Sequence, residues 1–277
     1  MTEAKDYPLG YSEQEARRLA EQGALLEEFT AELFQRAGLR QRMRVLDIGC
    51  GVGDVALLAA RVVGPQGAVL GIDRAASSVE TASARASALG VGHVRFEQAE
   101  LTNFGTGQTF DALVGRLVLL YLPDPAETLG RLSRHLRPDG IIAFQEFDMS
   151  ATSQVPASEL FLEVRGWLLS AFAAAGAQLD MGTKLYSCFL RAGLPPPQMT
   201  AATPVACGPA TGGYGYLVAV LRSLLPLIER TGIATAAQIG IDTLAARMRD
   251  DAIAHQRVLF LPRVVGAWTA LDQHPTA

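Results

Sequence analysis

A glycine-rich turn is the part of this sequence with the clearest chemical meaning. Residues 45–54 read V-L-D-I-G-C-G-V-G-D, where a short apolar run gives way to a helical pattern. Glycines at such a turn let a ligand approach the backbone closely, and the helix that follows offers free N–H groups. The spacing is G-x-G-x-G, whereas G-x-G-x-x-G is typical of pyrophosphate binders. We expect the turn to bind a ligand; a tight strand–helix turn that binds nothing is the competing interpretation.

Three acidic residues are expected near this turn, each at the end of a strand. Asp47 lies two positions before the first glycine, where its charge would repel a pyrophosphate but suit an ammonium group. Asp73, 20 residues after Gly53, can accept hydrogen bonds from both hydroxyls of an adenosine ribose. Glu100, followed by Leu101, could hold an adenine. The competing interpretations are a helix N-cap or surface acid for Asp73 and a solvated surface acid for Glu100.

A parallel sheet is needed to bring these residues together, and the hydrophobic pattern predicts one. Short apolar strands are expected at 44–48, 68–72, 94–97, 110–114 and 140–147. Helical patterns at 55–63, 77–89 and 125–136 alternate with them. Such alternation is typical of βαβ units. The predicted fold class is α/β, with a Rossmann-like, seven-stranded, mostly parallel sheet and a helical cap.

The rest of the chain flanks this core. A helix is predicted at 11–37, and after residue 150 the alternation stops. The remaining predicted elements are helices at 158–177, 184–192, 216–230 and 243–259, a strand at 198–206, a flexible linker at 208–215 and a final edge strand within 262–271. We therefore divide the chain into an N-terminal helical lid (1–40), an α/β core (41–150) and a helical cap of about 40 residues with the final strands of the sheet (151–277).

Composition excludes several classes of protein. The 277 residues are 49% hydrophobic and 19% charged, which suits one large domain or a core with an insertion. The net charge of −4 gives no basic field for nucleic acid or an anionic membrane, and apolar runs are too short to span a bilayer. The cysteines are three and widely spaced, so no disulfide framework or metal site is expected. These features predict a cytoplasmic protein, monomeric or homodimeric, that binds neither nucleic acid nor membrane.

The sequence resembles the class I S-adenosylmethionine-dependent methyltransferases that act on small molecules, types 11 and 25 in particular. The matching pieces are the turn at 45–54, G-I-D at 71–73, Q-A-E-L at 98–101 and the segments 110–124 and 136–147. They occur in the expected order over about residues 1–150. Glu100 stands where the family usually has Asp, and Asp139 replaces a common glycine.

The resemblance implies a set of residues that bind S-adenosylmethionine: Tyr11, Asp47, Gly49, Gly51, Asp73, Arg74, Glu100, Leu101 and Arg116. The two glycines would line the methionine portion, and Asp47 would reach its amino group directly or through water. Asp73 would hold the ribose, with Arg74 beside the adenine and Glu100 and Leu101 at its border. Arg116 would lie near the sulfonium and the carboxypropyl end, and Tyr11 would cover the cofactor.

The catalytic residues are unknown from the sequence. A sulfonium methyl is already activated, so the protein mainly aligns a nucleophile, and a base is needed only when the acceptor must lose a proton. Glu146, after the fifth strand, and His255, on the cap helix, are the candidates for such a base or for substrate binding. A structural ion pair is the competing interpretation of Glu146.

The expected activity is methyl transfer to oxygen, nitrogen or carbon of a small hydrophobic or aromatic metabolite, with secondary metabolism as one setting. Cap aromatics available as pocket walls, or simply as core, are Trp167, Phe172, Tyr186, Tyr214 and Tyr216. One alternative is a non-catalytic S-adenosylmethionine sensor or partner protein. A less favoured one is an NAD(P)-dependent oxidoreductase, since the glycine spacing, Asp47 and the lack of a Tyr-x-x-x-Lys pair oppose it.

Overall fold

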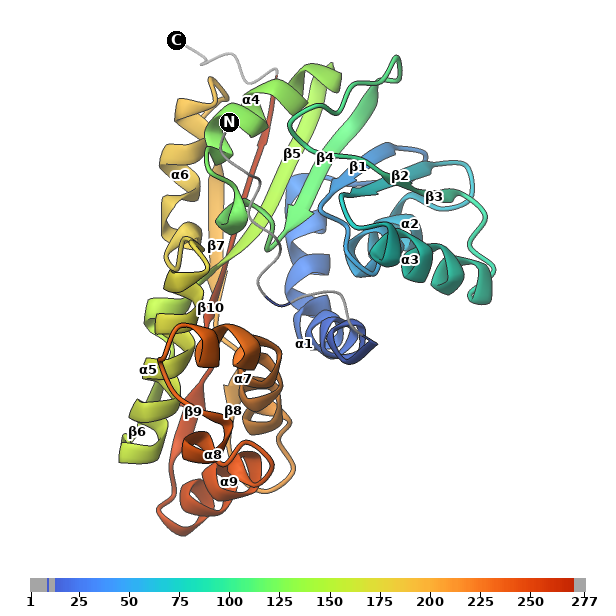
Figure 1. The fold of residues 1–277 in the computed structure, drawn as a ribbon. Coiled ribbons are helices and arrows are strands. Elements are labelled where there is room, and N and C mark those ends of the chain that lie inside the picture. Colours follow the sequence, from blue (N-terminus) through green and yellow to red (C-terminus); the bar gives the residue numbers. More distant parts are fainter. Residues whose placement is uncertain (1–8, 10–12, 272–277) are drawn as a thin grey trace.

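A seven-stranded sheet lies at the centre of the computed structural model, which describes residue 9 and residues 13–271. Its strands are β1 (Arg44–Ile48), β2 (Ala68–Asp73), β3 (Val94–Gln98), β4 (Phe110–Arg116), β5 (Leu136–Asp148), β7 (Gln198–Ala202) and β10 (Arg263–Ala270). Their order in the sheet is β3-β2-β1-β4-β5-β10-β7 (Figure 1). The first five run parallel, and β10 is antiparallel to both of its neighbours. The predicted Rossmann-like, mostly parallel sheet is confirmed.

Alternate residues of the parallel strands enter different hydrophobic layers. On β1, Val45 packs in the layer of α1 (Glu13–Ala37) and α2 (Asp54–Val63), whereas Leu46 packs in that of α4 (Pro125–Leu132) and α6 (Met181–Arg191). Helix α3 (Ala76–Ala88) contacts β2 and β3. Both faces of the sheet are covered, which is why its strands read as continuous apolar runs.

A second lobe holds a small antiparallel sheet in the order β6-β9-β8, drawn below the main sheet in Figure 1. Its strands are β6 (Ser153–Val155), β8 (Val205–Ala206) and β9 (Val258–Phe260). The helices of this lobe are α5 (Glu159–Ala174), α7 (Gly213–Arg230), α8 (Ala236–Ile239) and α9 (Leu244–Ala254). The cap is therefore larger than the predicted 40 residues, and it is not purely helical.

Two predicted elements of the cap have the wrong bounds, because each includes a short strand that pairs with a distant segment. The expected strand 198–206 is divided around Pro204, because its first part pairs with β10 and its last part pairs with β9. The expected helix 243–259 ends at Ala254, since Gln256 adopts a left-handed φ of 54° and the chain then returns as β9. Strands of two or three residues, such as β8 and β9, depend on partners that are distant in sequence.

The final strand and the linker also differ from expectation. Strand β10 lies between β5 and β7 and is not an edge strand; its interior residues Val264–Trp268 are buried. Within the expected linker at 208–215, helix α7 already begins at Gly213. Short 3₁₀ turns occur at Leu119–Tyr121, Ser133–His135 and Met149–Ala151. The second of them ends the expected helix 125–136 early, after Leu132.

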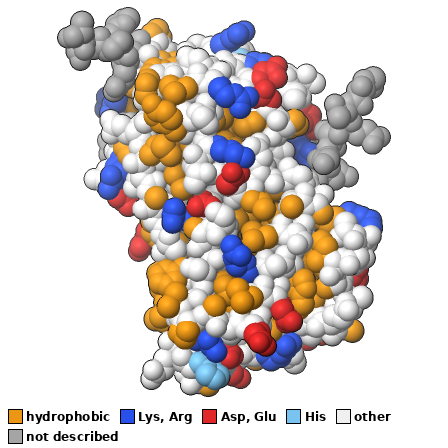
Figure 2. Space-filling view, turned by 90° about the vertical axis from the view of Figure 1, so that its left-hand side faces the viewer, with side chains coloured by type: hydrophobic (Ala, Val, Ile, Leu, Met, Phe, Trp, Pro, Cys, Tyr) orange, Lys and Arg blue, Asp and Glu red, His pale blue; other side chains and the backbone are white. Residues whose placement is uncertain are grey.

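The surface carries charges of both signs. On the face shown in Figure 2, Lys and Arg side chains are interspersed with Asp and Glu, and hydrophobic side chains lie between them. Helices α5 and α6, which lie on this side of Figure 1, expose Leu162, Tyr186 and Leu190. In the described ranges, 9 and 13–271, none of the helices combines the length and the apolar character needed to cross a bilayer.

Phe144 tests the packing beneath the site. This fully buried ring on β5 fills the space that Gly115 leaves on β4, where a Cβ atom would lie 2.5 Å from Phe144 Cε1. We expect Phe144→Ala to lower the free energy of unfolding by about 3–5 kcal/mol, because it opens a cavity in the core. The control Leu162→Ala, at a side chain that is 54% exposed, should change it by less than about 0.5 kcal/mol. Equal effects in urea titrations would contradict this packing.

Candidate active site

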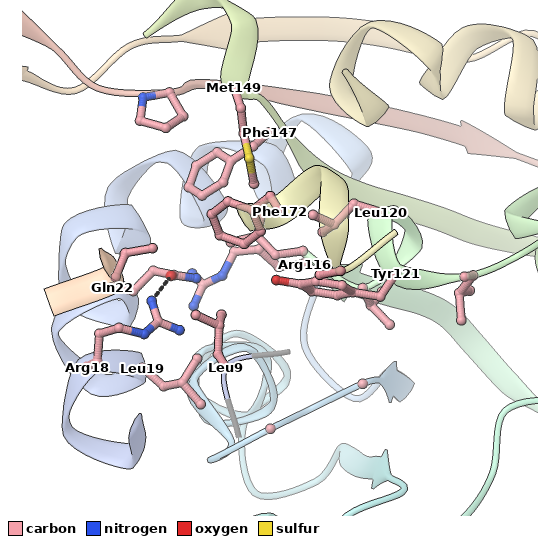
Figure 3. Close-up of a pocket in the computed structure, with 18 of the residues that line it drawn as sticks. Leu9, Arg18, Leu19, Gln22, Arg116, Leu120, Tyr121, Phe147, Met149 and Phe172 are labelled. Atoms are coloured by element: carbon pink, nitrogen blue, oxygen red, sulfur yellow. Dashed lines mark hydrogen bonds between the residues drawn. The ribbon is translucent and has the colours of Figure 1, made fainter. Parts of the chain in front are cut away.

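A cavity of about 610 Å³ lies where the carboxyl ends of the parallel strands meet α1 and the cap. Figure 3 shows Arg116 of β4, Arg18 and Gln22 of α1 and Phe172 of α5 around it. The predicted cofactor-binding residues that line the cavity are Gly49, Gly51, Asp73, Arg74, Glu100, Leu101 and Arg116. The structure thus brings together residues from four separate strand ends. Tyr11 lies outside the described residues.

The glycines of the turn are required by its backbone. Gly49, Gly51 and Gly53 have φ values of 62°, 52° and 89°, which residues with a side chain rarely adopt. A Cβ atom at Gly49 would also lie 2.5 Å from Val118 Cγ2. A Cβ atom at Gly51 would have no neighbour within 4 Å. The turn therefore packs tightly on one side and leaves open space at Gly51, which lines the cavity.

Asp73 ties this turn to the end of β2. Its Oδ2 accepts a hydrogen bond from the Gly51 N–H and its Oδ1 accepts one from the Ala75 N–H, both at 2.9 Å. Ala75 is the N-cap residue of α3. A carboxylate has about four lone-pair sites, so these two bonds leave capacity for further donors. The ribose role of Asp73 stays a prediction, compatible with this geometry.

Asp47 lies behind the turn and does not line the cavity. The residue is 1% exposed, and neither carboxylate oxygen makes a hydrogen bond of standard geometry within residues 9 and 13–271, although the Ala56 backbone N–H acts to lower the pKa of the carboxyl. Burial raises the pKa of this carboxyl well above its ordinary value, while the Arg116 guanidinium acts in the opposite direction. A buried carboxyl without partners is costly. An ammonium group bound at the turn, directly or through water, would supply the missing donors, so the residues present fit an amino-acid tail.

Arg116 is a half-buried cation that lines the cavity at the end of β4. Its Nη1 donates a 3.0 Å hydrogen bond to Thr30 Oγ1, and Thr30 in turn donates to Gln145 Oε1. Burial lowers the pKa of the guanidinium, and the nearby Asp54 and Asp47 raise it. A guanidinium in this setting can bind a carboxylate with two parallel hydrogen bonds.

The sequence analysis missed a buried polar network that joins α1 to α7. Arg18 donates through Nε and Nη2 to the Glu15 carboxylate and through Nη1 to Gln22 Oε1 (Figure 3). Tyr216 donates to the same Gln22 oxygen at 3.1 Å, and Ser223 donates to Glu15. Arg18, Gln22 and Tyr216 line the cavity. Polar residues at three- and four-residue spacing along one helix face were the available signal.

Glu146 does not line the cavity. It is fully buried, and its Oε1 accepts hydrogen bonds from the backbone N–H groups of Val118 and Leu119 at 3.0 and 2.8 Å. Burial raises the pKa of this carboxyl to about 8, although the backbone bonds act in the opposite direction. The segment that it holds follows β4, and Leu117, Val118 and Leu120 of that segment do line the cavity. The contacts thus give Glu146 a positioning role rather than the expected position in the pocket.

His255 is not brought to the cavity. It caps the carboxyl end of α9, its side chain is 58% exposed, and its Nδ1 lies 3.2 Å from Asp251 Oδ1. The candidate role of His255 as a base in the pocket has no support from this position, because α9 ends before it and its side chain is exposed. Of the predicted aromatic walls, Phe172 and Tyr216 line the cavity. Tyr186 is exposed, while Tyr214 is buried elsewhere in the cap.

The cap half of the cavity is mainly apolar. Its walls come from the segments after β4 and β5 and from α5 and α7, and include Leu120, Leu122, Phe147, Met149, Phe161, Leu168, Leu169, Phe172, Leu217 and Val220. The acidic lining residues Asp54, Asp73 and Glu100 lie at the other end, beside the glycine turn and the ends of β2 and β3. The cavity therefore has a polar end and an apolar end.

Comparison with known proteins agrees with this geometry. Residues 39–184, more than half of the chain, match the family described as "Methyltransferase domain". The chain therefore belongs to the methyltransferase domain family, an enzyme class whose cofactor is S-adenosylmethionine.

Relatives with assigned activities match over part of their length. The chain is 33% identical to a trans-aconitate 2-methyltransferase of Azoarcus sp. (strain BH72) over 147 residues, which is 53% of this chain and 54% of the relative. It is 35% identical to a nocamycin O-methyltransferase of Saccharothrix syringae over 51% of this chain and 46% of the relative. The chain spans about half the length of these relatives.

Solved structures share the fold at low sequence identity. The YcgJ protein of Bacillus subtilis superposes with a TM-score of 0.59 at 20% identity, covering 89% of this chain and all of that one. The [4+2]-cyclase SpnF gives a TM-score of 0.53 at 18% identity, covering 87% of this chain and 80% of that one. Since a protein titled as a cyclase has this fold, the fold by itself does not determine the reaction.

Ionisation of Glu146 is expected to lower the free energy of unfolding as pH rises. The folded-state pKa of about 8 lies above the ordinary value of 4.5, so between these pH values the unfolded chain releases a proton that the folded chain retains. The free energy of unfolding should then fall as pH rises from about 5 to 8, by at most about 1.4 kcal/mol per pH unit. Glu146→Gln keeps an oxygen acceptor for the two N–H groups but cannot ionise, so the variant should lose less stability over this range.

Urea titrations at several pH values measure this difference. The control Glu127→Gln, at an exposed position on α4, should follow the unmodified protein at every pH. Curves for Glu146→Gln that run parallel to those of the unmodified protein between pH 5 and 8 would contradict the assignment.

Proposed function

We propose that this chain transfers a methyl group from S-adenosylmethionine to oxygen, nitrogen or carbon of a small, mainly apolar acceptor. The observation that carries the proposal is the single cavity that joins the glycine turn to the apolar wall of the cap. A cofactor and an acceptor in one cavity can meet at the junction of its two ends. Orientation of this kind can contribute several kcal/mol to a transfer reaction.

In this proposal the chain holds the cofactor through the residues that line the polar end. Gly49 and Gly51 leave room for the methionine portion. Asp47, behind the turn, reaches the ammonium of that portion directly or through water, and Arg116 binds its carboxylate. Asp73 binds the ribose, and the adenine lies at the side of the cavity lined by Arg74, Glu100 and Leu101. When bound, S-adenosylmethionine supplies an activated methyl group. The chain's own contribution is to orient the acceptor and to exclude water.

The apolar walls support an acceptor with a hydrophobic or aromatic body. Phe147, Phe161 and Phe172 line the cap half, where an aromatic or aliphatic surface would lose contact with water. We assign no general base, because Glu146 lies outside the cavity and His255 is exposed at the end of α9. An acceptor group that is already ionised or nucleophilic needs none.

The relatives support the reaction class more strongly than the acceptor. Their names give trans-aconitate methylation and O-methylation in nocamycin formation. The family match ends at residue 184, whereas Tyr216, Leu217 and Val220 of the acceptor wall come from α7, beyond it. The part of the chain that selects the acceptor thus lies partly outside the part that identifies the family.

Turnover tests the proposal directly. Purified protein should form S-adenosylhomocysteine from S-adenosylmethionine when small aromatic and aliphatic acceptors are supplied, with methylated acceptor detected by mass spectrometry. Binding of the cofactor without turnover of any acceptor in a broad panel would favour a binding protein instead.

Asp73 tests the cofactor end of the cavity. We expect Asp73→Ala to weaken S-adenosylhomocysteine binding by about 1–3 kcal/mol, because it removes the acceptor for the ribose hydroxyls and for the Gly51 N–H. Asp111→Ala is a matched control: this carboxylate also accepts a backbone N–H, from Arg44, but at the opposite end of the sheet. Calorimetry that finds equal affinities for both variants would remove Asp73 from the site.

A further inference from the structure

The acidic side chains that line the cavity lie at one of its two ends. The acids Asp54, Asp73 and Glu100 belong to the glycine-turn end. Among the described residues that line the cap half, we find no Asp or Glu, and one arginine, Arg165 of α5, is present. Among the described residues, the cap elements thus contribute one positive charge, Arg165, to a mainly apolar acceptor end.

Arg165 is held in place by the backbone. Its Nε donates to the Thr152 carbonyl at 2.9 Å and its Nη2 donates to the Ser150 carbonyl at 3.0 Å. Across residues 9 and 13–271, no carboxylate lies within 4.0 Å of its guanidinium. These two bonds use two of the five N–H donors of an arginine, whose charge persists at any physiological pH. The group is fixed in position, and its charge is left for a partner from outside the chain.

The other arginines that line the cavity have different surroundings. Arg74 directly follows β2, at the glycine-turn end. Arg18 forms a buried ion pair with Glu15 at 2.6 Å. Arg116 lies at the end of β4, close to Asp47 and Asp54, where the carboxylate of the cofactor is proposed to bind. Arg165 comes from a helix of the cap and lines the cavity with the apolar Phe161, Leu168 and Leu169 of the same helix.

We propose that Arg165 binds a carboxylate on an otherwise apolar methyl acceptor. This inference rests on the proposed function and names the substrate class for the cap half of the same cavity. A carboxylate accepts two parallel hydrogen bonds from a guanidinium, and this charge-assisted pairing occupies its lone pairs. The carboxylate therefore orients the acceptor by binding Arg165. The methyl group is transferred to a different atom of the acceptor, near the junction with the glycine-turn end. A cationic amine acceptor is disfavoured, because this half of the cavity offers it a positive charge and no acid.

Three probes of equal shape test this charge preference. They are 4-phenylbutanoate, 4-phenylbutan-1-ol and 4-phenylbutylamine, titrated by calorimetry into the protein saturated with S-adenosylhomocysteine. We expect the carboxylate to bind about tenfold or more tightly than the alcohol, and the amine to bind most weakly, since charge-assisted hydrogen bonds are the stronger ones. Arg165→Gln, which keeps an amide donor for the carbonyls, should remove the preference for the carboxylate and leave alcohol binding unchanged.

The control variant is Arg247→Gln. Arg247 also donates to a backbone carbonyl, that of Ile239, but it does not line the cavity, so its replacement should leave all three affinities unchanged. Three results would overturn the inference. They are no binding of the carboxylate, equal binding of carboxylate and alcohol, and a preference for the carboxylate that persists in Arg165→Gln. S-adenosylhomocysteine affinity is measured in the same samples. If the unmodified protein does not bind S-adenosylhomocysteine, the proposed function is rejected. If it binds S-adenosylhomocysteine but the three probes bind equally, only the role of Arg165 is rejected.

Discussion

The close contact between the glycine turn and the segment after β4 is the constraint on which the site depends. Val118 occupies the space that a side chain at Gly49 would need, and Glu146 fixes Val118 by accepting its backbone N–H. On the other side of the turn, Asp73 accepts the N–H of Gly51. The turn is thus held from β5 through Val118 and from β2 through Asp73. Its open side, at Gly51, faces the cavity, so the backbone itself shapes the space for a ligand.

A second constraint joins the N-terminal helix to the cap. Arg18, Glu15 and Gln22 of α1 are all buried, and burying such groups is costly unless each is hydrogen-bonded. Tyr216 and Ser223 of α7 complete their bonding. Three members of this network, Arg18, Gln22 and Tyr216, line the cavity. The cap is therefore coupled to the cofactor end through α1 as well as through the sheet.

The sequence was sufficient to predict the core, because its signals are local. The short apolar runs that lead to Asp47, Asp73 and Arg116 are typical of buried strands. The turn needs residues at positive φ, which glycine adopts more readily than other residues. The residues predicted to line one cavity do so wherever they lie directly at a strand end or in the turn. Asp47 does not line the cavity, because it lies on the strand two positions before Gly49 and is buried beneath the turn.

The cap was harder to predict, because β6, β8 and β9 are at most three residues long and depend on distant partners. The roles of Glu146 and Arg165 are set by backbone groups of other segments, which no spacing in the sequence reveals.

Ligand discrimination at the glycine turn tests the central claim, that this turn receives a nucleoside with a charged amino-acid tail and not a diphosphate bridge. The measurement is a pair of calorimetric titrations of the unmodified protein, one with S-adenosylhomocysteine and one with NADH. The structure predicts saturable binding of S-adenosylhomocysteine at one site per chain and no measurable heat from NADH. Saturable uptake of the dinucleotide, with indifference to the thioether nucleoside, would contradict it.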